Sequence, residues 1–405
     1  MRMDLVRKHV FGRGVSCGLA LLAAGGMALP LLAAPLDVVT PSGGLHFGDL
    51  TVSPFADILY FYDSNYDRVE AGAEGTQGPS LRAGFDFSYG GNRHKWEGQF
   101  WSQWEKYLGE DRLDNKQWRE TIRYMYETPQ GTLLRLDHYW GEIYQSDFDR
   151  GLWQDRREFV LDTSVAHAVS PKTRLQMDIG FEDVQYKNPA LYDWREYSAG
   201  LSMARHFTPK SDIFLGLGAA LESSESYSGY SRSYRLNAGF ASRATERVTY
   251  RVAVGAEAFD FEGAANESVS WAPYYQLSAN WVASRKWTWS LSGRGEHQNS
   301  EESAGNYGVV YTLGLGAAYQ PNRRMSVAMK ALWRRDESEF PVLDPDSGNP
   351  ADSTDNEIGV RADLAYRLSK YASLRLGAEA VTQVSTINAN EYDRFRVDMG
   401  LNFRY

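Results

Sequence analysis

The sequence predicts an all-β protein: a transmembrane antiparallel up-and-down β-barrel of about 18 strands, with about 16 as the alternative count. Three observations support this prediction. Apolar residues recur at every second position over most of the chain, the connections alternate between short and long, and the last segment alternates up to an aromatic C-terminal residue. Each feature is typical of strands that cross a membrane with one face toward lipid.

The alternation begins near Ser53 and continues in segments of roughly 10 to 14 residues. In the segment 79–90, Leu81 and Phe85 fall on one face and Arg82 falls on the other. A soluble sandwich or barrel also alternates, but it needs only a few inward apolar residues per strand. A slip by one residue would turn the charged face to lipid, at about 2–4 kcal/mol for each Arg near the midplane, so we expect a single register.

The connections between these segments alternate in length. The short ones have tight-turn compositions, as in Gly90-Gly91-Asn92 and in 129–131. Longer polar connections lie between them, as in 65–78 and 337–355. Because outer-membrane barrels have tight periplasmic turns and long external loops, the pattern predicts strands that run up and down.

The composition excludes several classes of protein. Lys and Arg total 43 against 52 Asp and Glu, so the formal net charge is −9, and we expect no nucleic-acid partner. With 43% hydrophobic and 14% aromatic residues, the chain is not disordered. The mean hydropathy is −0.48, and no apolar run of about 18 residues follows the first thirty or so, which argues against membrane-spanning helices.

The N-terminal residues have the features of a secretory signal peptide. Basic residues up to Arg13 precede an uncharged stretch, 14–32. We expect cleavage after Ala28, with Ala34 as the second choice. The chain then divides into a signal peptide (1–28), a periplasmic N-terminal segment (29–52) and an outer-membrane β-barrel (53–405).

The single cysteine, Cys17, lies within the predicted signal peptide. The mature chain would therefore have no thiol. This predicts no disulfide, no thiolate metal site and no cysteine nucleophile in the exported protein.

The last segment gives the most specific prediction. Apolar residues occupy every second position from Phe395 to Tyr405. This pattern resembles the C-terminal targeting strand of bacterial outer-membrane proteins, which the barrel-assembly machinery recognises in that family. We therefore predict Phe403 and Tyr405 as an assembly signal, and the outer membrane of a Gram-negative bacterium as the location.

Charged residues of both signs, mostly arginine among the cations, fall on the inward face. A barrel of about 16–18 strands leaves an aqueous channel, and charged rings can select solutes, whereas cross-strand ion pairs that brace the wall are the alternative role. The candidates for pore lining are Arg82, Asp86, Arg119, Arg123, Arg135, Arg156, Arg174, Arg235, Arg251, Arg361, Asp363, Arg375 and Arg396. The same pattern also places Arg195 and Arg205 inward, and Trp101 and Tyr274 as inward rings that could stack on sugars.

The two ends of the barrel differ in charge, with acids in the long connections and bases at the tight turns. An acidic external mouth would concentrate cations. Of the histidines away from the turns, His138 lies on a lipid-type face and His297 lies at a loop base beside Glu296, so no Ser–His or Asp–His site can be assembled. We expect no catalytic residue, no metal site and no cofactor, and therefore not an enzyme.

The opening hairpin resembles a known family. The stretch 58–66, with sequence ILYFYDSNY, is followed after an acidic loop by 79–84, with sequence PSLRAG. Together these segments resemble the first hairpin of the putative beta-barrel porin 2 family. The resemblance implies an outer-membrane barrel that passes or organises an exopolysaccharide, and it assigns no catalytic residue.

These observations predict a porin-like channel that passes hydrophilic solutes across the outer membrane, with a link to exopolysaccharide export implied by the resemblance alone. The expected partners are outer-membrane lipid and lipopolysaccharide, the barrel-assembly machinery, and polysaccharide or small hydrophilic solutes. The alternative is a closed barrel whose acidic loops bind an external ligand or surface. A hydrolase is the third reading.

Overall fold

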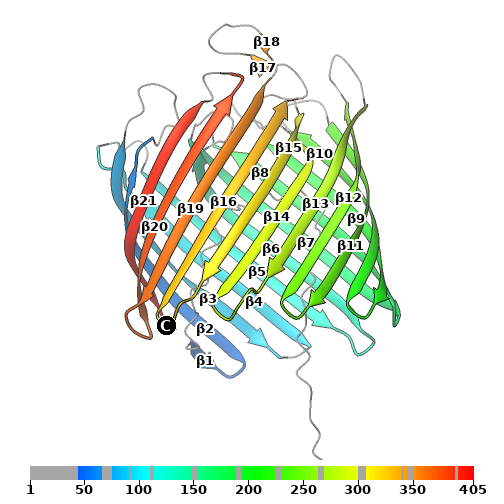
Figure 1. Cartoon of the computed structure of the whole chain (residues 1–405), viewed down its shortest axis with the longest axis horizontal. Coiled ribbons are helices and arrows are strands. Elements are labelled where there is room, and N and C mark those ends of the chain that lie inside the picture. Colours follow the sequence, from blue (N-terminus) through cyan, green and yellow to red (C-terminus); the bar gives the residue numbers. More distant parts are fainter. Residues whose placement is uncertain are drawn as a thin grey trace, which may run out of the picture.

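The computed structural model describes residues 44–65, 75–91, 93–109, 114–146, 153–187, 193–224, 230–262, 269–299, 307–338, 342–343, 350–351, 353–387 and 391–405. Eighteen long strands form a closed antiparallel barrel (Figure 1). Each strand pairs with its neighbours along the chain, and β2 pairs with β21 as well as β3, which closes the barrel. The predicted fold and strand count are confirmed, and the alternative count of 16 is wrong.

The barrel strands are β2 (Leu50–Asp63), β3 (Thr76–Gly90), β4 (His94–Glu105), β5 (Asn115–Glu127), β6 (Thr132–Ser146), β7 (Trp153–Ser170), β8 (Thr173–Tyr186), β9 (Trp194–Thr208), β10 (Ser211–Ser224), β11 (Tyr230–Thr245), β12 (Val248–Glu262), β13 (Val269–Trp281), β14 (Trp287–Asn299), β15 (Tyr307–Tyr319), β16 (Met325–Ser338), β19 (Thr354–Arg367), β20 (Ala372–Ser385) and β21 (Tyr392–Arg404). The short strands are β1 (Leu45–Phe47), β17 (Val342–Leu343) and β18 (Pro350–Ala351). Within the described residues, no helix is long and apolar enough to cross a membrane.

The tight turns gather at the end of the barrel that carries the C-terminus, and the long connections gather at the other end (Figure 1). Gly90 and Gly131 take left-handed backbone conformations at two of these turns, with φ of 106° and 78°. Residues with a Cβ rarely adopt such angles, which explains glycine at both positions. The turn end is therefore the periplasmic end, and the loop end faces the outside.

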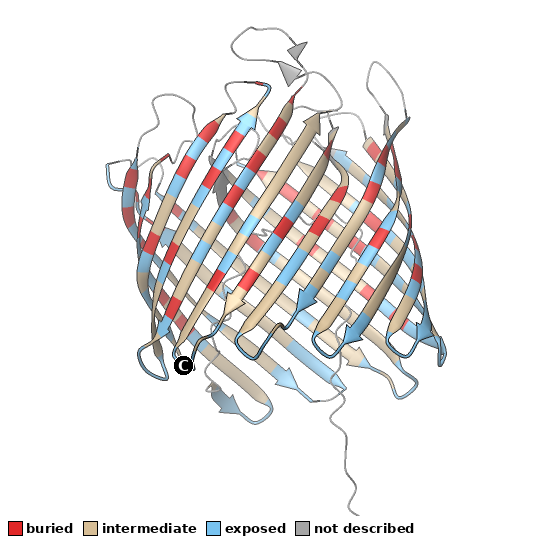
Figure 2. Cartoon of the chain, in the orientation of Figure 1, coloured by how far each residue is buried: buried red, intermediate tan, exposed pale blue. Residues whose placement is uncertain are grey.

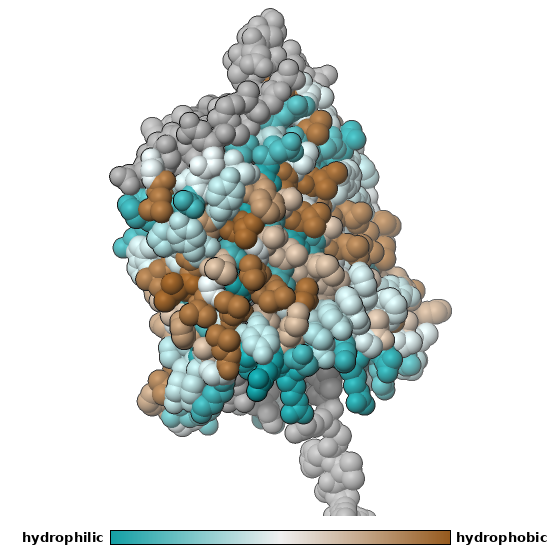
Figure 3. Space-filling model, turned by 60° about the vertical axis from the view of Figure 1, so that its left-hand side comes forward, coloured by the Kyte–Doolittle hydropathy of each residue, from teal (hydrophilic) through white to brown (hydrophobic). Residues whose placement is uncertain are grey.

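The outer face of the barrel is apolar. Buried and exposed residues alternate along the strands (Figure 2), and the apolar side chains gather over the middle of the outer surface with hydrophilic ones at the periplasmic rim (Figure 3). Leu217 and Ile179 are 55% and 51% exposed on this face. A band of this kind is too large for a surface in water, and it shows that the barrel spans a membrane.

Two ionisable side chains interrupt this band on neighbouring strands. Glu120 of β5 lies opposite Phe100 and Trp140, and His138 of β6 lies opposite Ile122. Residues directly opposite in a ladder share one face of the sheet, so both point outward. The outward position predicted for His138 agrees with this register.

The chain enters the barrel through a small hairpin at the periplasmic rim. β1 pairs with the first residues of β2, with Leu45 opposite Val52, and Gly48 takes a φ of 65° in the turn between them. Since β2 begins at Leu50, the end of the predicted N-terminal segment, 29–52, forms part of the sheet. The predicted signal peptide, 1–28, lies outside the described residues.

The last strand closes the barrel beside the first. The backbone N–H of Tyr405 donates to the carbonyl oxygen of Pro54 (3.0 Å), and the Tyr405 ring stacks on Tyr371 with centroids 5.1 Å apart. Phe403 and Tyr405 are 39% and 46% exposed on the outer face. The outward register predicted for this segment is what the structure has.

Candidate functional site

The candidate site is the inner wall of the barrel. Every residue predicted to line the pore lies at a strand position that faces the interior, in register with buried polar residues such as Asp57 and Asp398. The strands place them there because side chains alternate across a sheet and the apolar set faces lipid. Among the predicted pore-lining residues, Arg174 lies at the periplasmic end of the barrel, where it is exposed.

Many of these side chains form ion pairs along the wall. Arg82 Nε lies 2.7 Å from Asp57, which is on the neighbouring strand, and Arg123 Nε lies 2.6 Å from Asp137 directly opposite. Arg361 Nη1 lies 3.1 Å from Glu379, on the next strand. These pairs join neighbouring strands. The bracing role that we weighed as the alternative therefore accounts for much of the lining charge.

Other lining charges pair either within one strand or with the next strand. Arg135 bonds Asp137 two residues along its own strand, and Arg375 reaches Asp363 at 3.1 Å. Arg156 lies 3.7 Å from Glu158. Asp86 accepts from Gln99 (2.6 Å) and from Arg404.

The inward aromatic rings are covered by arginine. The guanidinium carbons of Arg82 and Arg119 lie 5.7 and 5.6 Å from the centroid of Trp101. Arg235 lies 4.4 Å from the centroid of Tyr274, and Arg251 lies 3.8 Å from that of Phe214. A sugar that stacked on Trp101 or Tyr274 would have to displace these cations, which are held by cation–π attraction.

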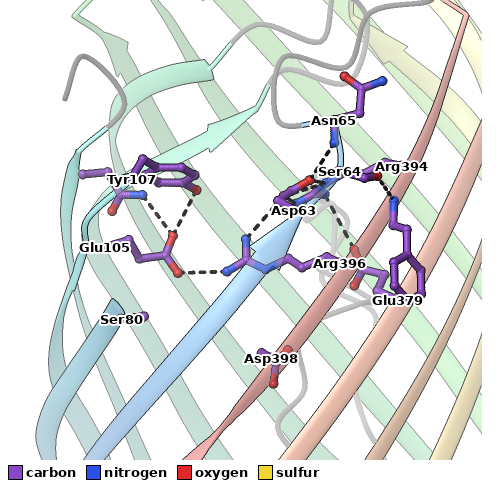
Figure 4. A network of polar contacts seen from close by, with 12 residues as sticks. Asp63, Ser64, Asn65, Ser80, Glu105, Tyr107, Glu379, Arg394, Arg396 and Asp398 are labelled. Carbon is purple, nitrogen blue, oxygen red and sulfur yellow. Dashed lines mark hydrogen bonds and ion pairs between the residues drawn. The ribbon is translucent and has the colours of Figure 1, made fainter. Parts of the chain in front are cut away.

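A group of charged side chains around the fully buried Asp63 lies where the first and last strands meet (Figure 4). Asp63 is fully buried and accepts from Arg394 Nε at 3.0 Å on each of its carboxylate oxygens. Arg396 lies beside this pair and donates to Glu105 at 3.1 Å, and Glu379 lies 3.7 Å from Arg394 on the other side. We call these five residues the closure cluster.

A glycine on β3 allows close packing beside the closure cluster. A Cβ at Gly78 of β3 would lie 1.6 Å from the carbonyl oxygen of Lys106, so only glycine fits. Over this glycine, Phe61 of β2 meets Tyr107, which follows β4, with ring centroids 5.0 Å apart at 62°. Burial and the neighbouring Glu105 carboxylate raise the pKa of Tyr107, which keeps its hydroxyl protonated as a donor to that carboxylate.

The loop that follows β4 is tied down by one carboxylate. Asp114 accepts from the backbone N–H of Tyr107 at 2.8 Å and from Lys106 at 2.9 Å. Desolvation acts in the opposite direction, but these two donors hold the pKa of Asp114 below its usual value. The side chains around Gly78 therefore have a fixed support at the extracellular rim.

Sequence reasoning missed most of the closure cluster. Asp63 and Arg394 are not among the predicted lining residues, although Arg396 is. The signal was present in the alternation itself, because Asp63 follows Asp57 at an even spacing on β2 and Arg394 precedes Arg396 by two residues on β21.

The predicted inward positions of Arg195 and Arg205 are wrong. Arg195 Nε bonds Asp183 at 2.6 Å, and this pair lies one position away from Glu182 and Glu196, which are opposite each other and face inward. Arg205 lies opposite Ile213, which is 49% exposed on the outer face. Arg195 and Arg205 share the outward face with Tyr197, Leu201 and Met203 and lie near the two ends of the strand, where the cost of a charge toward lipid is low, so their charge did not fix which face is inward.

An acidic strip replaces arginine on part of the inner wall. The inward carboxylates Asp162, Asp178, Glu182 and Glu196 lie on the adjacent strands β7, β8 and β9. Glu196 was missed for the same reason that Arg195 was misplaced. These four carboxylates form an acidic strip on the inner wall, with Arg156 of β7 and Arg174 of β8 beyond its two ends.

The histidines considered for catalysis do not form a hydrolytic site. His138 faces outward and packs on Phe159 at 5.1 Å between centroids. His297 lies within β14, near its end, and packs on Phe259 at 5.3 Å. In the part of the chain that the structure describes, no group of three or more His, Cys, Asp or Glu is arranged to hold a metal ion.

The comparisons with known proteins give structural likeness without sequence likeness. The structure of Pseudomonas aeruginosa OpdK with vanillate aligns over 87% of this chain and 99% of OpdK, at 12% identity and a TM-score of 0.48. Acinetobacter baumannii OccAB4 aligns over 88% of this chain and 98% of OccAB4, at 10% identity and a TM-score of 0.47. The copper transporter OprC aligns over 84% of this chain, at 10% identity and a TM-score of 0.46, and the chain spans 62% of OprC.

No family model and no curated protein sequence matches the chain. The resemblance of 58–66 and 79–84 to the putative beta-barrel porin 2 family therefore stays a prediction. The location follows from the architecture: a closed, even-numbered antiparallel barrel with an apolar outer band, tight turns at one end and long loops at the other is an outer-membrane protein of a Gram-negative bacterium.

Proposed function

We propose that the barrel is a porin-like channel through which hydrophilic solutes cross the outer membrane. The observation that carries this proposal is the inner wall, where a barrel too wide to fill with side chains is lined by charges that pair along the wall. Small inward residues on β10 and β15, including Gly216, Gly314 and Gly316, add to the space on that side.

Ion conductance of the full-length protein in a planar bilayer tests this proposal. We expect a steady open conductance. The Arg123 side chain is 45% exposed on the inner wall. Arg123→Gln removes this positive charge from the lumen and should shift the ratio of cation to anion permeability toward cations. Arg232→Gln, at an outward position of β11, is the matched control and should leave the ratio unchanged. If neither the unaltered protein nor the two variants conducted ions, the channel proposal would be overturned. The closed barrel that binds an external ligand would then be favoured.

The exopolysaccharide link belongs to the same proposal but rests only on the family resemblance. Uptake of size-graded oligosaccharides into proteoliposomes tests it. Passage of acidic oligosaccharides at a rate above that of neutral ones of equal size would support a role for the lining arginines. Exclusion of all oligosaccharides beyond a few sugars would restrict the channel to small solutes.

We infer that Phe403 and Tyr405 form the signal by which the barrel-assembly machinery receives this chain, with outer-membrane lipid and lipopolysaccharide as its surroundings. Both side chains are outward on the last strand. Tyr405→Ala should lower the amount of assembled barrel in outer-membrane fractions, while refolding of the purified variant in detergent should be unaffected. An equal loss in both assays would assign these residues to stability alone.

A further inference from the structure

The ladder between β13 and β14 is incomplete at its extracellular end. The two strands pair from Trp281 opposite Trp289 up to Tyr275 opposite Gly295, and the pairing stops there. Both strands continue: β13 stays paired with β12 up to Val269, and β14 stays paired with β15 up to Asn299. The residues 269–274 and 296–299 thus form two facing edges, which we call the open seam.

A proline accounts for where the pairing stops. The N–H of Val282 donates to the carbonyl of Arg247 (2.8 Å), so these two residues form a hydrogen-bonded pair of the β12–β13 ladder. Bonded and non-bonded pairs alternate, so the odd-numbered residues of β13 direct their amides toward β14. Pro273 is the next such position beyond Tyr275, and it has no N–H to donate.

A side chain takes the place of the missing backbone partner. His297 would lie opposite Pro273 if the register continued, but its backbone N–H donates to Glu257 Oε2 at 3.1 Å. Glu257 belongs to β12 and is 1% exposed. Its other oxygen accepts from Arg235 at 2.7 Å, and the ring of Phe259 covers His297. The seam is therefore closed by side chains, which can exchange partners more easily than a ladder.

Proline alone does not open a ladder. Pro79 of β3 also directs its nitrogen toward the next strand, since Lys106 N–H donates to the Pro79 carbonyl at 3.0 Å. Pairing nevertheless continues past it, with Leu108 N–H donating to the Gln77 carbonyl at 2.9 Å. The open seam needs both Pro273 and the Glu257 carboxylate that occupies the gap.

The two sides of the open seam have different chemistry. On the outer face of the barrel, Trp271 and Val269 are 71% and 55% exposed. Inside, Arg235 stacks on Tyr274 and lies 3.5 Å from Glu296. Unpaired strand edges are not tolerated against hydrocarbon unless they border protein or a water-filled space. The incomplete ladder thus has an apolar exterior and a charged interior, which match a molecule with an apolar tail and a polar head.

We propose that the open seam is a lateral portal that admits an amphiphile with an acyl tail and an anionic head between the membrane and the lumen. The head replaces Glu257 as the partner of Arg235 and of the His297 N–H, while the tail stays beside Trp271 and Val269. This route is separate from axial passage of hydrophilic solutes and adds a second class of solute to the barrel.

Block of ion conductance by oleate added to the membrane tests the portal. We expect oleate to reduce the conductance of the unaltered protein, because its head enters the lumen at Arg235. Pro273→Val restores an amide toward β14 and should lower sensitivity to oleate about tenfold, while Pro79→Val should leave it unchanged. Equal sensitivity of Pro273→Val and the unaltered protein would overturn the portal, and equal block by uncharged monoolein would overturn the assignment of the head to Arg235.

A second readout does not depend on conduction. A fatty acid with a diazirine next to its carboxylate should label the inward residues Glu257 or Tyr274 after reconstitution in phospholipid vesicles and illumination. The label there should fall in folded Pro273→Val and persist in Pro79→Val. Labelling confined to outward residues would contradict the portal even if the barrel conducts ions, and inward labelling without conductance would support the portal while the channel proposal fails.

Discussion

Between β2 and β21 the strands pair from Phe55 opposite Arg404 to Asp63 opposite Arg396, and backbone contacts continue beyond, with Ser64 N–H donating to the Phe395 carbonyl at 2.9 Å. Between β13 and β14 the ladder stops at Tyr275, with four residues of β14 still to come. Both places have buried ion pairs at the extracellular end. Between β2 and β21 the charged pairs add to a complete backbone ladder. At the open seam the Glu257 carboxylate takes the place of backbone pairing.

This difference shows how similar chemistry can serve two purposes. The Asp63–Arg394 pair joins the two ends of the chain, so breaking it separates strands that no turn connects. The Glu257–His297 contact joins β12 to β14 at the open seam, where the periplasmic parts of β13 and β14 stay paired and are linked by a short connection, so breaking it can be local.

The largest effect is expected at the closure cluster. Asp63→Ala leaves Arg394, which is 8% exposed, without its bidentate partner, and should lower the free energy of unfolding by about 3–5 kcal/mol. Urea unfolding followed by the gel shift of the folded barrel measures it. Asp260→Ala removes a half-exposed partner 3.9 Å from Arg232 and should change stability by less than about 1 kcal/mol. Equal losses would show that burial of the closure cluster is unimportant.

A smaller effect is expected at the glycine beneath the closure cluster. Gly78→Ala puts a Cβ 1.6 Å from the Lys106 carbonyl oxygen, so the chain after β4 must shift and Tyr107 must lose its place on Phe61. We expect a loss of about 1–3 kcal/mol by the same unfolding assay. Gly91→Ala is the control, since nothing lies within 4 Å of a Cβ there. If Gly78→Ala left the free energy of unfolding unchanged, β3 and the chain after β4 could separate at no cost in stability.

The smallest effect is expected at the open seam. Pro273→Val supplies an amide that faces β14 and can extend the ladder by one hydrogen bond, which should stabilise the barrel by about 0.5–1.5 kcal/mol. The same unfolding assay measures this gain, and Pro79→Val, in a ladder that is already continuous, is the comparison. A loss of stability at Pro273 would indicate that the Glu257 contact closes the seam better than backbone pairing does.

The fold was predictable because lipid imposes a strict alternation. The outward set of the last strand, from Phe395 to Tyr405, and the inward arginines from Arg82 to Arg396 follow from a period of two and the cost of charge in hydrocarbon. Prediction failed where that cost is low. In β9, Arg195 lies on the outer face at the extracellular end of the strand, where charge toward lipid costs little, and the prediction that it faces inward was wrong.

The partners of the lining charges were not predictable from sequence. Asp63 and Arg394 are separated by most of the chain and meet only because the barrel closes. The open seam was also missed, although Pro273 stands in the sequence, because Pro79 occupies a similar position in a ladder that continues. What distinguishes them is Glu257, which belongs to a different strand.

Amide hydrogen exchange of the membrane-reconstituted protein tests the contrast between the two seams most directly. The account predicts slow exchange of the amides of Phe395 and Tyr405, which are bonded across the closure, and fast exchange at Trp271, whose amide faces the open seam. The Tyr275 amide, within the paired part of β13, should be slow. Protection of Trp271 equal to that of Tyr275 would show that β13 and β14 are joined along their whole length and would contradict the account.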